Sequence, residues 1–221
     1  GFVIEKQPLA TPGLIGHWRF DETSGATAFD TSGRDRDLVF SSENSWDDGA
    51  AFNGEPDPST GSFLRQATTS SDTAAQFSLG AGNKLTASLW VRPGRMARRA
   101  GSILWHGANN QANLRIALDN QLRIVAEIDN INPSTPIIAT RPLSEHRWYH
   151  VAVVYDGAIS SASSRLRLSI DGQLDRIGTE NSSSLPTGTA RLFVGQRNDR
   201  TDDPKFNGNL RDLRLITEAL S

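Results

Sequence analysis

Three aspartates near the two ends of the chain have the chemistry of a calcium site. Asp21 and Asp30 follow the first segment with strand character, and Asp212 lies within the last one. Calcium takes about six to eight oxygen ligands, mostly carboxylates and loop carbonyls. If the first and last strands pair, these carboxylates meet at one seam, so we predict a structural calcium ion there. The alternative is that Asp21 and Asp30 cap turns while Asp212 pairs with Arg211 or Arg214.

A second group of residues has the chemistry of a glycan site. Of the 23 basic residues 20 are arginines, and four of these lie in the segment RPGRMARRAG, residues 92–101. Guanidinium groups bind carboxylates and sulfates through paired hydrogen bonds, and indole rings stack on sugars. We predict that Arg95, Arg98 and Arg99 contact an acidic polysaccharide and that Trp105 stacks on a sugar. The competing interpretation of this segment is a solvated loop.

Two-residue hydrophobic periodicity indicates the strands that must position these groups. Residues 85–91 (LTASLWV) set Leu85, Ala87, Leu89 and Val91 on one face, against Thr86, Ser88 and Trp90 on the other. Two hairpins are expected, in residues 113–128 with a turn at Asp119-Asn120 and in residues 169–174 with a turn at Asp171-Gly172. The fold class is therefore all-β, with a two-sheet antiparallel sandwich or jelly roll over 13–221 and adjacent N- and C-terminal strands. Residues 1–12 read as a linker or the tail of an upstream domain.

Nine short segments with recognisable patterns follow one another along the chain. They are GLIGHWRFDETSG (13–25), AFDTSG (28–33), GAAFNG (49–54), LTASLWVRP (85–93), ILWHG (103–107), HRWYHVAVVYDG (146–157), LRLSIDGQL (166–174), LFVGQR (192–197) and FNGNLRDLRLITEALS (206–221). In this order they resemble the laminin-G-like jelly-roll family of the concanavalin A-like lectin and glucanase superfamily. The resemblance implies a sandwich of two curved antiparallel sheets. It also implies a calcium ion where the first loop meets the last strand, at Asp21 and Asp212, although Arg211 stands where many relatives have a second acid.

No complete catalytic set is visible in the sequence. EIDNIN (127–132) resembles the E-x-D-x-x-E signature of related glucanases, but Asn132 stands where the acid/base glutamate is needed. A retaining glycosidase requires two carboxyl groups about 5–5.5 Å apart. The motif G-x-S-x-G, a phosphate-binding loop and a dinucleotide fingerprint are all absent. We therefore predict that the domain is not an enzyme.

Amino-acid composition and net charge exclude further classes of site and partner. The 221 residues include no cysteine, which excludes disulfides and thiolate sites, and the net charge of −2 argues against nucleic-acid binding. The sequence has no apolar run of about 18 residues, so we expect no membrane insertion. We predict a noncatalytic carbohydrate-binding module of a larger bacterial extracytoplasmic protein. Its expected partners are a glycan or surface protein and the neighbouring domains of its own chain. A protein-interaction or adhesion domain is the alternative, and a polysaccharide-degrading enzyme is a third hypothesis.

Overall fold

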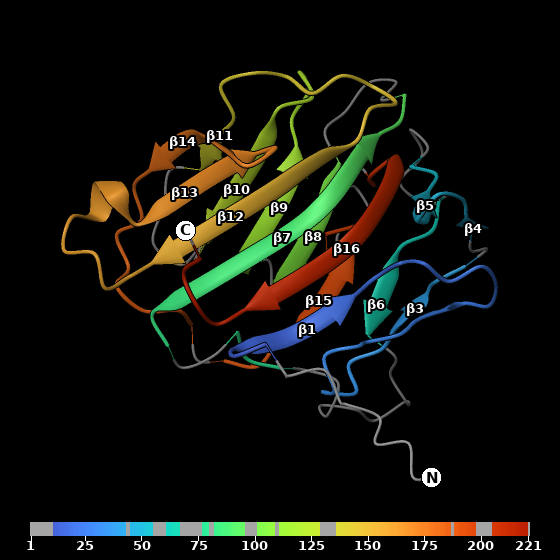
Figure 1. Cartoon of the computed structure of the whole chain (residues 1–221), viewed down its shortest axis with the longest axis horizontal. Helices are drawn as coiled ribbons and strands as arrows, with labels where there is room; N and C mark the ends of the chain where they lie inside the picture. Colours follow the sequence, from blue (N-terminus) through green and yellow to red (C-terminus); the bar gives the residue numbers. More distant parts are fainter. Residues whose placement is uncertain are drawn as a thin grey trace, which may run out of the picture.

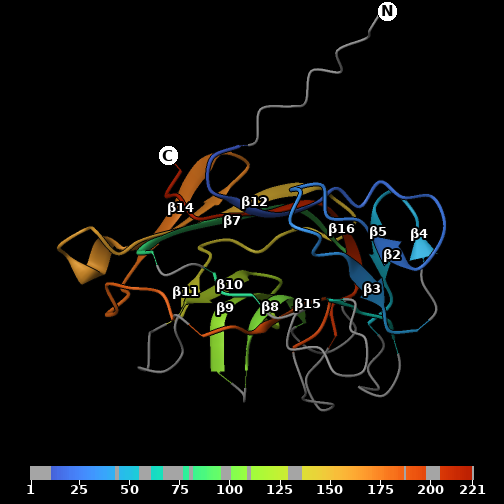
Figure 2. The ribbon, with the colours of Figure 1, turned by 90° about the horizontal axis from the view of Figure 1, so that it is seen from below.

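The computed structural model shows two antiparallel sheets packed face to face. It describes residues 11–42, 45–54, 61–66, 77–79, 82–95, 101–108, 111–128, 136–186, 188–197 and 205–220. The two layers are separate in the side view of Figure 2, with β7, β12 and β16 in one and β8, β9, β10 and β15 in the other. The prediction of an all-β two-sheet sandwich is confirmed.

One sheet, here called sheet A, faces the viewer in Figure 1. Its strand order is β14-β13-β12-β7-β16-β5-β4, and β1 also pairs with β16. All its pairings are antiparallel. The bounds are β1 Leu14–Trp18, β4 Ser45–Trp46, β5 Ala50–Phe52, β7 Lys84–Pro93, β12 Tyr149–Asp156, β13 Leu166–Ile170, β14 Gln173–Gly178 and β16 Gly208–Ile216.

The other sheet, here called sheet B, lies behind sheet A and has the order β11-β10-β9-β8-β15-β6-β3-β2. The bounds are β2 Thr27–Ala28, β3 Leu38–Phe40, β6 Leu64–Gln66, β8 Ser102–Ala108, β9 Gln111–Leu118, β10 Ile124–Ile128, β11 Ile137–Ile138 and β15 Arg191–Val194. Within the described ranges the only helical segment is a 3-10 turn, Ala162–Ser164, and no helix there is long and apolar enough to cross a membrane.

The first and last described strands are neighbours, as predicted from the sequence. In the antiparallel register of β1 and β16, His17 lies opposite Arg214 and Trp18 opposite Leu213. The indole of Trp18 is fully buried and its Nε1 donates to the carbonyl of Arg36 at 2.8 Å. This pairing fixes the N-terminal segment against the last strand, so both contribute side chains to the same outer surface of sheet A.

The hydrophobic core lies between the sheets because each strand turns alternate side chains inward. On β7 the inward residues are Leu85, Ala87, Leu89 and Val91, each at most 1% exposed. Burial of this apolar surface is the main favourable term for the fold. The same alternation turns Trp90 away from the core, where 40% of its surface is exposed.

Both predicted hairpins are present. β9 and β10 pair from Leu118 opposite Ile124 onward, and β13 and β14 are joined by Asp171 and Gly172. The last two residues both have positive φ, 52° and 74°, as a type I′ turn requires. Of the predicted linker, residues 1–10 lie outside the described part of the chain, so its role stays a prediction.

Candidate functional site

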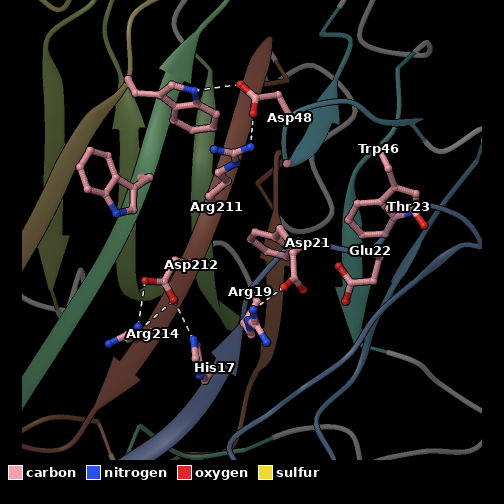
Figure 3. A pocket seen from close by; sticks show the side chains of 14 residues that line it. His17, Arg19, Asp21, Glu22, Thr23, Trp46, Asp48, Arg211, Asp212 and Arg214 are labelled. Atoms are coloured by element: carbon pink, nitrogen blue, oxygen red, sulfur yellow. Dashed lines mark hydrogen bonds and ion pairs between the residues drawn. The ribbon is translucent and has the colours of Figure 1, made fainter.

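A groove of about 820 Å³ opens on the outer face of sheet A, between the sheet and the segments after β1 and β4. Three tryptophans line it: Trp46 from β4, Trp90 from β7, and Trp148 just before β12. The polar lining comes from β1, β16 and the loops beside them (Figure 3). We call this region the tryptophan groove; its charged lining residues are Arg19, Asp21, Glu22, Asp48, Arg211, Asp212 and Arg214.

A bulge in β16 turns Arg211, Asp212 and Arg214 toward the groove, while Leu213 between them points inward. Arg211 lies opposite Trp90 and Arg214 opposite Ser88, so β16 takes one more residue than β7 to cover the same length. Asp212 has φ 51° at the bulge, and its N–H donates to the carbonyl of Arg19 at 3.0 Å. As a result the inward residues of β16 are spaced unevenly, at Leu210, Leu213 and Leu215.

The turn after β1 builds the opposite rim of the groove. Phe20 is fully buried yet has φ 56°, a conformation that bulky side chains rarely adopt. This turn anchors the chain in the core while Asp21, Glu22 and Thr23 line the groove. Glu22 is held in place because its Oε1 accepts from the N–H of Phe29 at 2.8 Å.

The β4–β5 turn brings Asp48 against β16, and it depends on a glycine. A Cβ at Gly49 would lie 2.4 Å from the carbonyl oxygen of Leu210, and the φ of 111° also disfavours any other residue. Asp48 forms an ion pair with Arg211 and accepts a hydrogen bond from Trp148 Nε1 at 3.1 Å. One carboxylate therefore orients both an arginine and an indole of the groove (Figure 3).

Each of the three indole rings is fixed by a contact. Trp46 Nε1 donates to the carbonyl of Gly25 at 2.7 Å. The guanidinium of Arg211 lies 5.0 Å from the ring centre of Trp148, and the rings of Trp90 and His150 are 5.3 Å apart. Rings held in this way can meet an apolar sugar face with little loss of side-chain entropy.

The structure does not bring the three predicted calcium ligands together. Asp30 accepts hydrogen bonds from the backbone N–H groups of His17, Ser32 and Arg36, which makes it a turn cap. Asp21 pairs with Arg19 at 2.6 Å. Among the described residues there is no group of three acidic or histidine side chains that could hold a metal ion. Asp30 and Asp212 match the alternative considered from the sequence, whereas Asp21 pairs with Arg19. In this arrangement the three carboxylates do not form a calcium site, and calcium binding stays a prediction.

Both carboxylate oxygens of Asp212 already have hydrogen-bond partners. Its Oδ1 is 2.7 Å from His17 Nε2, and Arg214 donates to both oxygens at 3.0 and 2.9 Å. Burial opposes ionisation, but the hydrogen bonds from His17 and Arg214 outweigh it and hold the pKa of Asp212 below its usual value. Asp212 is thus a charged, oriented wall of the groove.

We expect Asp212→Asn to leave any response of the protein to calcium unchanged. A saturated structural site with calcium at 100 times its Kd would stabilise the fold by about 2.7 kcal/mol, which is roughly 5–10 °C in Tm. Melting curves of wild type and Asp212→Asn, with EDTA and with excess calcium, measure this. A calcium-dependent rise in Tm that the substitution removes would contradict the assignment of Asp212 to His17 and Arg214.

Trp105, predicted to stack on a sugar, is fully buried, which corrects that prediction. It packs with Ala112 and Phe193 on the outer side of sheet B, and the guanidinium of Arg197 lies 4.6 Å from its ring centre. An indole with no exposed face cannot serve as a sugar platform in this structure. The expectation failed because ILWHG, read alone, does not reveal what covers the strand.

The predicted arginine patch is only partly described. Arg98 and Arg99 lie outside the described residues. Arg95 is exposed, does not line the tryptophan groove, and its carbonyl accepts from Asn207 Nδ2 at 2.9 Å. Arg92 turns toward Asp48, 3.5 Å away, and so supports the groove from outside its lining.

The glucanase-like glutamate Glu127 lies on β10 of sheet B and pairs with Arg115 at 3.0 Å. Its carboxylate is therefore held by a neighbouring strand. Asp129 to Asn132 of the same motif lie outside the described residues.

Comparison with known proteins agrees with the fold. The family model described as concanavalin A-like lectin/glucanases superfamily matches residues 65–221. The chain belongs to this superfamily. The matched part begins within β6 and includes the whole of β7 to β16. No curated protein sequence is significantly similar to the chain.

Three solved structures show the same fold at low sequence identity. Domain 4 of AbnA, an extracellular GH43 arabinanase from Geobacillus stearothermophilus, solved with arabinotriose, is 20% identical with TM-score 0.65, and the match covers 94% of each chain. Trypanosoma rangeli sialidase is 14% identical with TM-score 0.65, covering 95% of this chain and 31% of the sialidase. Botulinum neurotoxin type C, whose cell entry depends on two ganglioside molecules, is 12% identical with TM-score 0.65, covering 95% of this chain and 49% of the neurotoxin chain. This chain thus spans about a third of the sialidase and half of the toxin chain.

Proposed function

We propose that this domain is a noncatalytic carbohydrate-binding module and that the tryptophan groove is its glycan site. The observation that carries the proposal is the grouping of Trp46, Trp90 and Trp148 beside paired carboxylates and guanidinium groups in one open groove. Pyranose and furanose rings combine an apolar face with a hydroxyl rim, and this lining offers partners for both. The volume of about 820 Å³ suits an oligosaccharide segment better than a single sugar.

Two relatives of the same fold support this proposal by what they bind. The arabinanase domain was solved with arabinotriose, and the neurotoxin interacts with gangliosides. Within this proposal the chain is one domain of a larger bacterial protein outside the cytoplasm. Such a module would hold the parent protein on a polysaccharide.

Affinity electrophoresis of the purified domain on gels containing single polysaccharides tests this function. We expect retardation by at least one polysaccharide, and equal retardation of an Arg95→Ala variant, because Arg95 lies outside the groove lining. Unretarded migration on every neutral and acidic polysaccharide would contradict a glycan-binding function. Retardation lost in Arg95→Ala would instead place the site at the loop that follows β7.

A protein partner is the second candidate function. Leu174 and Ile177 are 56% and 50% exposed on β14, at the edge of sheet A. An edge strand with exposed apolar side chains can pair with a partner strand. Loss of partner binding in a Leu174→Asp and Ile177→Asp double variant would favour this function over glycan binding.

A further inference from the structure

The charged lining of the tryptophan groove is balanced between acids and bases. It holds three arginines and four carboxylates, so it carries one net negative charge, leaving His17 aside. This balance is unexpected for a chain rich in arginine, whose exposed guanidinium groups would favour acidic ligands. Electrostatic attraction by the groove as a whole thus gives no preference for an anion.

Every arginine of the lining is already paired with a carboxylate. Arg19 lies 2.6 Å from Asp21, and Arg214 binds both oxygens of Asp212. Arg211 pairs with Asp48. An anionic sugar that approached one of these guanidinium groups would also approach the carboxylate paired with it, which would repel it.

Displacing such a carboxylate would be unfavourable even though exposed ion pairs contribute little, about 0–1 kcal/mol. The released carboxylate would remain beside the anionic ligand and repel it. Asp48 is also held by Trp148, whose Nε1 donates to its Oδ2 at 3.1 Å. The Gly49 turn also holds this segment against Leu210.

A neutral sugar meets no such conflict. A hydroxyl group can donate to a carboxylate and accept from a guanidinium at once, so it uses a paired acid and base without separating them. The pairs also hold both side chains in position before the ligand arrives, which lowers the entropy cost of binding.

From these observations we infer that the tryptophan groove binds neutral glycans and discriminates against uronic-acid, sialylated and sulfated ones. This inference rests on the proposed glycan-binding function and names its ligand class. It replaces the acidic polysaccharide expected from the arginine-rich segment with an uncharged ligand. Stacking on the tryptophans then supplies most of the affinity, and hydrogen bonding to the paired groups supplies orientation.

Matched polysaccharide pairs separate charge from sugar structure. The probes are highly methyl-esterified homogalacturonan with its de-esterified form, and hydroxyethyl cellulose with carboxymethyl cellulose, together with neutral arabinan, galactan, xylan and mannan. We expect the tightest binding to a neutral polysaccharide, at least tenfold tighter than to any acidic one. Its Kd should change less than twofold between 50 and 500 mM NaCl. The small salt dependence is expected because salt screens interactions between charges and has little effect on the binding of an uncharged sugar.

The possible outcomes distinguish the glycan-binding function from the preference for neutral glycans. Binding only to acidic polysaccharides, with a Kd that rises about tenfold or more at high salt, would overturn the inference and leave the glycan-binding function intact. Binding to no polysaccharide would overturn both.

One substitution should reverse the preference. Asp48→Asn keeps an oxygen acceptor for Trp148 and suits the φ of 53°, which asparagine tolerates well, but it frees Arg211 and Arg92. We expect Asp48→Asn to bind heparin or de-esterified homogalacturonan at least threefold more tightly than wild type. Asp35→Asn is the matched control, with the same charge change and a φ of 55° at an exposed position outside the groove. Equal affinity for these acidic probes in wild type and Asp48→Asn would contradict the inference, as would an equal gain in Asp35→Asn.

Discussion

Replacing Trp90 with alanine is expected to weaken glycan binding about 30-fold while leaving the fold intact. A buried tryptophan contact at a binding site commonly contributes about 2 kcal/mol or more, which is roughly 30-fold in Kd. Trp90 lies on β7, between β12 and β16 of sheet A, and lines the groove. Isothermal titration with the best polysaccharide from the retardation experiment measures the loss.

The stability cost of Trp90→Ala should be small, less than about 1 kcal/mol, because the side chain points away from the core and is 40% exposed. Leu174→Ala is a suitable control, since Leu174 is an exposed apolar residue of the same sheet outside the groove. Wild-type affinity in Trp90→Ala would show that the ligand binds elsewhere. An equal loss in Leu174→Ala would point to the edge of the sheet.

Acid should destabilise the domain strongly through His106, which is fully buried in β8. Its Nε2 lies 2.8 Å from the carbonyl of Phe77, and its Nδ1 lies 3.3 Å from the amide nitrogen of Asn113. With the proton on Nε2 both contacts are hydrogen bonds, whereas a second proton on Nδ1 would face the Asn113 amide. Burial is the main cause that lowers the pKa of His106 to about 4, and the charge of Arg36 adds to it.

The sign of the effect follows from this lowered pKa. Between the ordinary pKa of 6.5 and about 4, the unfolded chain binds a proton that the folded chain does not. The free energy of unfolding should therefore be highest above pH 6.5 and fall by about 3 kcal/mol as the pH drops to 4. Carboxylates also titrate in acid, so the relevant quantity is the difference in the free energy of unfolding between wild type and His106→Gln.

Urea unfolding of both proteins at pH 7 and pH 4 measures that difference. Glutamine can still donate to the Phe77 carbonyl but does not titrate, so we expect the wild type to lose about 3 kcal/mol relative to His106→Gln on acidification. If the variant does not fold, the imidazole signals of wild-type His106 give the same information by NMR. A His106 ring that becomes protonated near pH 6.5 would contradict this account.

The alternation of apolar and polar residues predicted the fold. It also indicated the outward position of Trp90, which we did not use in predicting the site. In residues 85–91 the alternation already placed Trp90 on the face of Thr86 and Ser88, opposite the apolar residues. We nevertheless expected Trp90 and Trp148 to pack in the core or between the sheets, because both lie inside patterned strands. The period of two was the better guide, since it fixes the face of a side chain regardless of residue type.

Other features of the site could not be predicted from local sequence. The bulge in β16 exists only relative to β7, and the ion pair of Asp48 with Arg211 joins residues far apart in the chain. The burial of Trp105 likewise depends on Phe193, which comes from a strand much later in the sequence. From the sequence we predicted that Asp212 binds calcium. In the structure the pairing of β1 with β16 places His17 against its carboxylate.

The five tryptophans allow the most direct test of the tryptophan groove as the glycan site. Each indole N–H gives one signal in a ¹⁵N-correlated NMR spectrum, and tryptophan substitutions assign them. On addition of a bound oligosaccharide, we expect the signals of Trp46, Trp90 and Trp148 to shift, and those of the buried Trp18 and Trp105 to stay in place. A shift of Trp105 with the three groove signals unchanged would contradict the account and place the ligand on sheet B.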